Sequence, residues 1–172
     1  DVALARMPHE ARHDPRLWFY GRIAFAEPAV NEIAEAYSAA WAMRQAKPVK
    51  VIAIDFDNTL WGGVFGDDGI ERLQCGDDPP GNAFKAFQVE CLRLKAQGKL
   101  LIALSKNNTD ALEILDRHVG MALRRDDFAA VAVNWQPKSD NIRRIATDLN
   151  LGLESFMFLD DSPHEREAMR RL

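Results

Sequence analysis

Short apolar runs alternate with stretches of helical periodicity over most of this chain. Continuous Val, Ile, Ala, Leu and Phe runs predict strands that are buried on both faces, as in a parallel sheet covered by helices. The predicted strands are residues 49–56, 99–105, 129–135 and 155–161. The predicted helices, which have apolar spacing near 3.6 residues, are residues 80–98, 108–119, 139–150 and 163–172.

This alternation predicts right-handed βαβ units. The expected fold class is therefore α/β: a doubly wound, Rossmann-like parallel sheet with helices on both faces. Residues 62–74 break the alternation, because a Gly-Asp-Asp-Gly core lies between short apolar pieces. That pattern predicts a small β-hairpin flap. Ser162 and Pro163 predict the start of the last helix as N-cap and first-turn residue.

Residues 1–48 differ in character from the rest of the chain. Segment 7–28 holds three prolines and lacks clear periodicity, so we expect it to be mostly irregular. Residues 29–46 have helical spacing, which Pro48 ends. We expect residues 1–48 to be a linker and helical segment from a longer chain, and residues 49–172 to be a separate domain.

Composition narrows the classes of partner. The 172 residues are 47% hydrophobic and 28% charged, which is typical of a soluble globular domain. A net charge of −4 argues against a nucleic-acid partner. No run approaches the ~18 apolar residues of a membrane helix, so we expect no membrane association. The chain has only two cysteines, Cys75 and Cys91, without ligand-like spacing. Nothing suggests a disulfide scaffold, so we expect a reducing cytoplasm.

Polar side chains follow each predicted strand at its carboxyl end, the edge where such sheets bind ligands. In chain order they are Asp55 and Asp57; Ser105, Lys106, Asn107 and Asn108; Asn134, Trp135 and Lys138; Asp160 and Asp161. Carboxylates this close raise each other's pKa unless a cation neutralises them. Their oxygens suit Mg²⁺, which commonly also takes substrate phosphate oxygens. We therefore expect a phosphorylated substrate, with Ser105 and Lys138 as donors to its oxygens.

Each of these residues also has a structural explanation. Asp and Asn often end strands as turn formers, Ser105 is placed like a helix-cap neighbour, and Lys138 alone resembles a surface lysine. Asp160 and Asp161 before Ser-Pro could be a capping cluster. The functional hypothesis rests on the combination of these residues. Four separate strand ends supply complementary groups, and the structural explanation must account for each of them independently.

Four blocks of this sequence resemble the motifs of the haloacid dehalogenase (HAD) superfamily of phosphotransferases. "DFDNT", residues 55–59, is similar to its first motif, DxDx[T/V]. Ser105 matches the second motif, Lys138 the third, and Asp160 with Asp161 the acidic fourth. The resemblance covers about residues 49–172. It implies a HAD-like catalytic domain that is truncated at its C-terminal end, before the usual fifth strand.

A closer resemblance is to the FkbH-like family of polyketide and related biosynthesis. It rests above all on "NTLWGGV" and "NWQPKS", residues 58–64 and 134–139, with further similarity in 14–25, 104–108 and 151–167. Members take a glyceryl unit from 1,3-bisphosphoglycerate, remove phosphate and load the acyl group onto an acyl carrier protein. The resemblance therefore implies two partners, a phosphorylated three-carbon substrate and the phosphopantetheine thiol of a carrier protein.

The resemblance also implies roles for individual residues. Asp55 is the nucleophile that forms an aspartyl-phosphate, and Asp57 is the general acid/base. Mg²⁺ lies on Asp55, the Asp57 main-chain carbonyl and Asp160, with Asp161 close by. Ser105 and Lys138 hold the phosphate, and Lys138 balances the charge of Asp55. Candidates for the rest of the substrate are Lys106, Asn107, Asn108, Asn134 and Trp135.

Trp61 and the pair Gly62-Gly63 are candidates for shaping access of the substrate. Core packing is the equal alternative for Trp61 and Trp135.

Two features depart from this pattern or qualify it. Many FkbH-like members carry a cysteine where this chain has Leu104. Cys75 could carry the acyl group instead, although a structural thiol is the alternative, and Cys91 is expected to face the core. The gaps at 62–80 and 109–129 are too short for a cap domain, so the site is expected to be open, for a carrier-protein arm or a covering domain.

Two other functions compete with the glyceryl transferase. Leu104 favours a plain Mg²⁺-dependent HAD phosphatase that acts on a small phosphate ester or a phosphoprotein. The third function is a non-catalytic scaffold or carrier-docking module. The full set of expected site residues argues against it: Asp55, Asp57, Ser105, Lys138 and Asp160.

Overall fold

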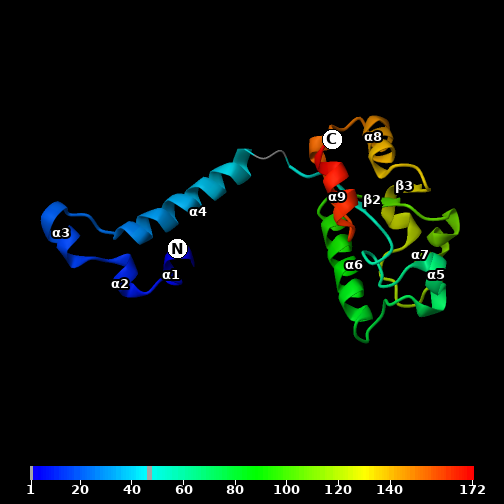
Figure 1. The fold of residues 1–172 in the computed structure, drawn as a ribbon, viewed down its shortest axis with the longest axis horizontal. Coiled ribbons are helices and arrows are strands. Elements are labelled where there is room, and N and C mark those ends of the chain that lie inside the picture. The colour runs from blue at the N-terminus through cyan, green and yellow to red at the C-terminus, as the bar shows by residue number, and fades with distance from the viewer. Residues whose placement is uncertain (1, 46–47) are drawn as a thin grey trace. The chain divides into compact units, whose positions relative to one another are not determined.

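Two compact units make up the chain, Asp1–Lys47 and Pro48–Leu172. The computed structural model describes residues 2–45 and 48–172. Figure 1 shows the first unit, from blue to cyan, as helices and loops, and the second unit, from cyan to red, as helices with a sheet. The unit boundary lies next to Pro48, where the sequence changes in character.

The first unit is more helical than its sequence suggested. It contains α1 (Val2–Ala5), α2 (His9–Arg12), α3 (Pro15–Gly21) and α4 (Glu27–Gln45). The expectation that segment 7–28 is mostly irregular was wrong for α2 and α3. Asp14 caps α3 through its side chain, which accepts a hydrogen bond from the Arg16 amide, and Pro15 occupies the first turn. These are standard helix-start residues.

A four-stranded parallel sheet forms the centre of the second unit. Its strands are β1 (Val51–Ile54), β2 (Leu100–Ser105), β3 (Phe128–Val133) and β4 (Phe156–Leu159), in the order β3-β2-β1-β4. Ile54 at the end of β1 pairs with Ala103 and Leu159 on its two neighbours. This register brings the carboxyl ends of the strands to one edge of the sheet, as predicted from the sequence.

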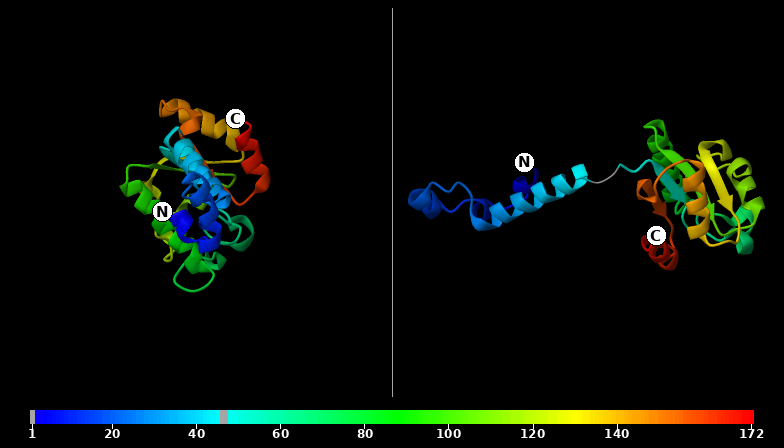
Figure 2. Two further views of the ribbon diagram at one scale, coloured as in Figure 1. Left: turned by 90° about the vertical axis from the view of Figure 1, so that its left-hand side faces the viewer. Right: turned by 90° about the horizontal axis from the view of Figure 1, so that it is seen from above.

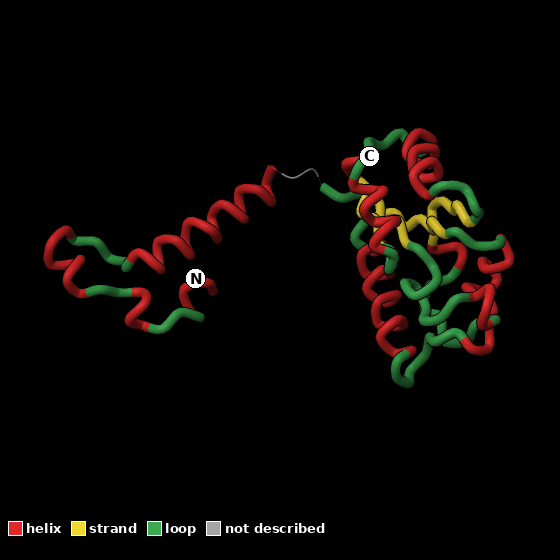
Figure 3. Tube along the Cα trace, viewed as in Figure 1, coloured by secondary structure: helices red, strands yellow, loops and turns green. Residues whose placement is uncertain are grey.

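Helices cover both faces of this sheet, which confirms the predicted α/β class. They are α6 (Gly81–Ala96), α7 (Leu112–Arg117), α8 (Lys138–Asp148) and α9 (Pro163–Arg170). Strand residues alternate between two cores: Ile52 and Ile54 pack with residues of α6 and α7, and Val51 and Ala53 with residues of α8 and α9. Figure 2 (right) and Figure 3, where strands are yellow, show the layers.

The predicted hairpin at residues 62–74 was wrong. The segment instead forms a short helix, α5 (Phe65–Asp68), and a 3₁₀ turn, η1 (Ile70–Arg72). The carboxylate of Asp68 accepts a hydrogen bond from the Val64 amide, at 2.9 Å, and so stabilises a helical turn. An isolated antiparallel bridge between Gly62 and Gln74 closes the segment at its base.

The connections between strands are short in residues 48–172. Between β1 and α6 lie only α5, η1 and loops, and between β2 and β3 lie α7 with the 3₁₀ turns Thr109–Ala111 and Arg125–Asp127. As predicted, this unit contains no large cap. A further 3₁₀ turn, Leu153–Ser155, precedes β4. Among the described helices, none has both the length and the hydrophobicity needed to cross a membrane.

Candidate active site

Three carboxylates meet at the carboxyl edge of the sheet. Asp55 follows β1, and Asp160 and Asp161 follow β4; each offers an oxygen, and these oxygens lie within 4.8 Å of one another. Asp55 and Asp160 are buried, and Asp161 is exposed. Such a cluster of hard oxygen donors suits Mg²⁺. The cluster found among the described residues does not contain the Asp57 carboxylate, so of the four expected metal residues it joins three.

Lys138 connects the two buried carboxylates. Its Nζ lies 2.9 Å from Asp55 Oδ1 and 2.5 Å from Asp160 Oδ2, and the lysine is only 4% exposed. Burial lowers the pKa of the Lys138 ammonium, but the two carboxylates outweigh it and hold that pKa above its usual value. Burial also raises the pKa of the Asp55 carboxyl, and Lys138 offsets this only in part. Lys138 is therefore the charge partner of Asp55, as expected.

Lys138→Met is expected to lower the free energy of unfolding by about 3 kcal/mol, because it leaves two buried carboxylates without their cation. Urea denaturation in metal-free buffer measures the loss. Lys106→Met is the matched control. Its ammonium is partly exposed and pairs with Glu165 at 2.6 Å, an interaction worth less than about 1 kcal/mol. An equal loss in the two variants would contradict the buried charge pairing.

Ser105 ends β2 beside Asp55 and is 2% exposed. A hydrogen bond from its side chain lowers the pKa of the Asp55 carboxyl, against the larger effect of burial. The hydroxyl thus lies next to the Asp55 carboxylate, and its role as a phosphate donor stays a prediction.

Asp57 is held by three donors from three places in the chain. The indole Nε1 of Trp61 donates to Oδ1 at 2.9 Å, and the backbone amide of Phe65 donates to the same oxygen at 3.0 Å. Asn107 Nδ2 donates to Oδ2 at 2.8 Å. The side chain of Asp57 is therefore oriented by hydrogen bonds, and it lies outside the carboxylate cluster of Asp55.

Trp61 and Gly62 lie in the core and do not line an open surface. Trp61 is 0% exposed and packs on Phe56, with ring centroids 4.9 Å apart. A Cβ on Gly62 would lie 2.8 Å from side-chain atoms of Gln74 and Phe84, so glycine is required there by close packing. Of the two alternatives for Trp61, core packing holds, together with its hydrogen bond to Asp57.

The other expected substrate residues make contacts of their own. Asn108 accepts a hydrogen bond from the indole of Trp135, which is 70% exposed, so for Trp135 the structure does not show core packing. Asn134 exchanges hydrogen bonds with Asn141 on α8, and Lys106 pairs with Glu165 on α9. Of these side chains, Trp135 presents the largest surface.

Three residues that were not predicted from the sequence also shape the site. Arg166 on α9 donates to the main-chain oxygens of Asp160 and Asp161, at 2.6 and 2.7 Å. Thr59 Oγ1 accepts a hydrogen bond from the Asp161 amide at 3.0 Å. Glu165 anchors Lys106. An arginine early in the helix that follows an acidic pair is a signal that could have indicated Arg166.

Neither cysteine has the surroundings of a reactive thiol. Cys75 is buried, its Sγ donates to the Gly120 carbonyl at 3.4 Å, and burial raises its pKa. Cys91 is 1% exposed on α6, and burial raises its pKa to about 11. Thiolates are the reactive form, so the structural alternative for Cys75 fits its position, and Cys91 faces the core as expected.

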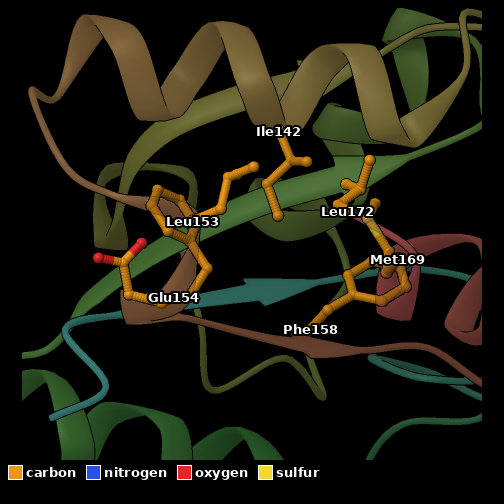
Figure 4. Close-up of a pocket in the computed structure, with 7 residues that line it drawn as sticks. Ile142, Leu153, Glu154, Phe158, Met169 and Leu172 are labelled. Carbon is orange, nitrogen blue, oxygen red and sulfur yellow. The ribbon is translucent and has the colours of Figure 1, made fainter. Parts of the chain in front are cut away.

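A separate apolar pocket lies beside β4 and contains none of the expected site residues. Figure 4 shows it between α8 and α9, with Ile142, Phe158 and Met169 among its lining side chains. The charged side chains and hydrogen-bond donors of the candidate site lie at the carboxyl edge of the sheet instead.

One solved structure to which this chain is similar is the N-terminal part of the protein BF1531 from Bacteroides fragilis, which contains a phosphatase domain and is complexed with Mg. The two sequences are 38% identical, and the TM-score is 0.76. The match covers 94% of this chain and 44% of the other, so this chain spans less than half the length of that one. No family model matches the chain, and no curated protein does.

Proposed function

We propose that this chain is a Mg²⁺-dependent phosphotransferase. The premise is that residues 48–172 have the fold of a HAD phosphatase domain. The observation that carries the proposal is the geometry around Asp55. This buried carboxylate lies beside the ammonium of Lys138, the hydroxyl of Ser105 and two further carboxylates. A turn-forming role explains neither the burial of Asp55, Asp160, Ser105 and Lys138 nor the convergence of the three carboxylates.

Mg²⁺ is the cofactor that we propose for the carboxylate cluster. Asp55, Asp160 and Asp161 would hold it, since their oxygens converge and hard oxygen ligands suit this ion. When bound, Mg²⁺ supplies positive charge that neutralises phosphoryl oxygens. The likeness to a phosphatase domain complexed with Mg supports this assignment.

Asp55 and Asp57 divide the reaction between them in our proposal. An Asp55 carboxylate oxygen attacks phosphorus, and the bond from phosphorus to the leaving oxygen breaks while Asp57 gives that oxygen a proton. Water then attacks the aspartyl-phosphate, Asp57 takes the proton of that water, and phosphate leaves with Asp55 restored. Lys138 and Ser105 orient the phosphoryl group through its oxygens.

The finer proposal is a glyceryl transferase, based on the FkbH-like motifs. 1,3-bisphosphoglycerate carries an acyl phosphate and a phosphate ester. A carrier-protein thiol would attack the acyl carbon and expel one phosphate, and the Asp55 chemistry would hydrolyse the ester. The absence of a large cap in residues 48–172 supports a substrate that is presented on a phosphopantetheine arm.

The surroundings of Cys75 and Cys91 favour direct loading of the carrier, without an acyl intermediate on either thiol. Leu104, which is fully buried, supports the second candidate, a plain phosphatase on a small ester or phosphoprotein. We also propose a cytoplasmic location, because both cysteines are free thiols and free thiols persist in reducing compartments.

Intact-mass spectrometry of a carrier protein tests the finer proposal. After incubation with the enzyme, Mg²⁺ and 1,3-bisphosphoglycerate, we expect a glyceryl mass on the phosphopantetheine arm, together with released phosphate. A reaction without enzyme is the control, because acyl phosphates react slowly with thiols even without a catalyst, and this reaction gives a background of modified carrier. Phosphate release with an unmodified carrier would contradict the transferase and favour the plain phosphatase.

A further inference from the structure

We propose that Trp61 and Asn107 are positioning residues that fix the carboxylate of Asp57 for proton transfer. The inference rests on the proposed function for the role of Asp57, and on geometry for the positioning itself. Both side chains donate to Asp57, one to each carboxylate oxygen, at 2.9 and 2.8 Å. With the Phe65 amide as third donor, the orientation of the carboxylate is specified from two sides.

The two donors are rigidly supported. The Trp61 ring is fully buried and stacked at a tilt on Phe56, so its Nε1 has little freedom to move. Asn107 is 4% exposed, and its Oδ1 accepts a hydrogen bond from the Asn108 amide at 3.1 Å, which fixes the direction of Nδ2. A proton-transfer group needs such support, because misplacement by about 1 Å can reduce a rate ~100-fold.

Burial of a tryptophan in the core does not by itself require a carboxylate partner. A Trp N–H in a core usually finds some acceptor, and here the acceptor is a side chain that is only partly buried and lies two residues after Asp55. Asn107 is 50 residues away from Asp57 in sequence. Donors from two distant segments therefore converge on this one carboxylate, which distinguishes positioning from packing.

Kinetics with two leaving groups give the first test. Trp61→Phe keeps the ring and removes the donor, and Asn107→Leu removes the other donor at similar volume. For an alkyl phosphate, whose leaving oxygen needs a proton, we expect kcat/KM to fall about tenfold or more. This ratio reports the steps up to formation of the aspartyl-phosphate, so it excludes the later hydrolysis that both substrates share. For an aryl phosphate, a good leaving group, the fall should be less than about threefold.

Trp61→Phe in an Asp57→Asn background distinguishes positioning of the Asp57 carboxylate from general damage to the structure. In Asp57→Asn protein, Trp61→Phe should cause no further loss of aryl phosphate turnover, because the group that it positions is gone. Trp41→Phe, in the first unit, is the matched control and should leave both substrates unaffected. Equal losses of kcat/KM with both leaving groups, or an undiminished loss in the Asp57→Asn background, would overturn the proposal.

The indole N–H signals in an NMR spectrum test the geometry without any activity. The chain has four tryptophans, and Trp61→Phe and Trp41→Phe identify two of their signals. Asp57→Asn should shift the Trp61 signal, because a charged acceptor becomes neutral, and leave the Trp41 signal in place. An unmoved Trp61 signal would overturn the positioning even in an active enzyme. If Asp57→Asn shifts the Trp61 signal but the wild-type protein has no phosphatase activity, the positioning stands and the proposed function alone is refuted.

Discussion

Asp55→Asn is expected to reduce phosphate release by at least about 10⁴-fold, because an amide cannot act as the nucleophile that splits phosphoryl transfer into two steps. The substitution changes the volume of the side chain little. It also removes one of the two carboxylates that contact Lys138, while Asp160 remains as a charge partner. The fold should therefore persist while the chemistry fails.

Phosphate release with a simple phosphate ester measures this loss, and circular dichroism with a thermal melt checks the fold. Asp126→Asn is the matched control, because Asp126 lies just before β3, at the opposite edge of the sheet from the site. Near wild-type turnover by Asp55→Asn protein with a folded spectrum would contradict the assignment of Asp55. Mass spectrometry of trapped protein should show a phosphoryl group in the wild type and none in the variant.

Removal of divalent cations is expected to reduce phosphate release at least about 100-fold. Three converging carboxylates repel one another and the substrate phosphate, and a bound cation relieves both repulsions. EDTA followed by dialysis measures the loss, and added Mg²⁺ should restore activity. Full activity after chelation would contradict the metal site.

Stability gives a second readout of the same site. A ligand that binds only the folded state stabilises it by about 2.7 kcal/mol at 100 times its Kd. We therefore expect Mg²⁺ to raise the melting temperature of the wild type and of Asp126→Asn, and to have a smaller effect on Asp160→Asn. An equal Mg²⁺ response in all three proteins would indicate binding elsewhere.

The sheet and its functional edge could be predicted from the sequence because both depend on local patterns. Val51–Ile54 and Leu100–Ser105 are apolar runs with few alternatives to a buried strand, and the parallel topology then places Asp55, Ser105 and Asp160 at one edge. The flap at 62–74 was mispredicted because Gly-Asp-Asp-Gly fits a hairpin turn and a short helix equally well. The Asp68 side chain decided between them.

The partners of Asp57 could not be predicted, because they depend on three-dimensional packing. Nothing in the sequence near Asn107 indicates that its side chain turns towards a residue 50 positions earlier. For Trp61 the sequence left two equal alternatives, shaping of substrate access and core packing, and the structure decided for burial in the core. Sequence patterns thus indicated which residues lie at the carboxyl edge of the sheet, and the structure showed which of them orient others through hydrogen bonds.

The position of β4 in the sheet has a consequence for local unfolding. In the described part of the chain β4 is an edge strand, with β1 as its sole neighbour in the sheet. Local opening proceeds through elements of low stability, and separation of β4 from β1 would carry Asp160 away from Asp55. Lys138, which contacts both carboxylates from α8, opposes that separation, so the charge that balances the two carboxylates also holds two strands of the sheet together at this edge.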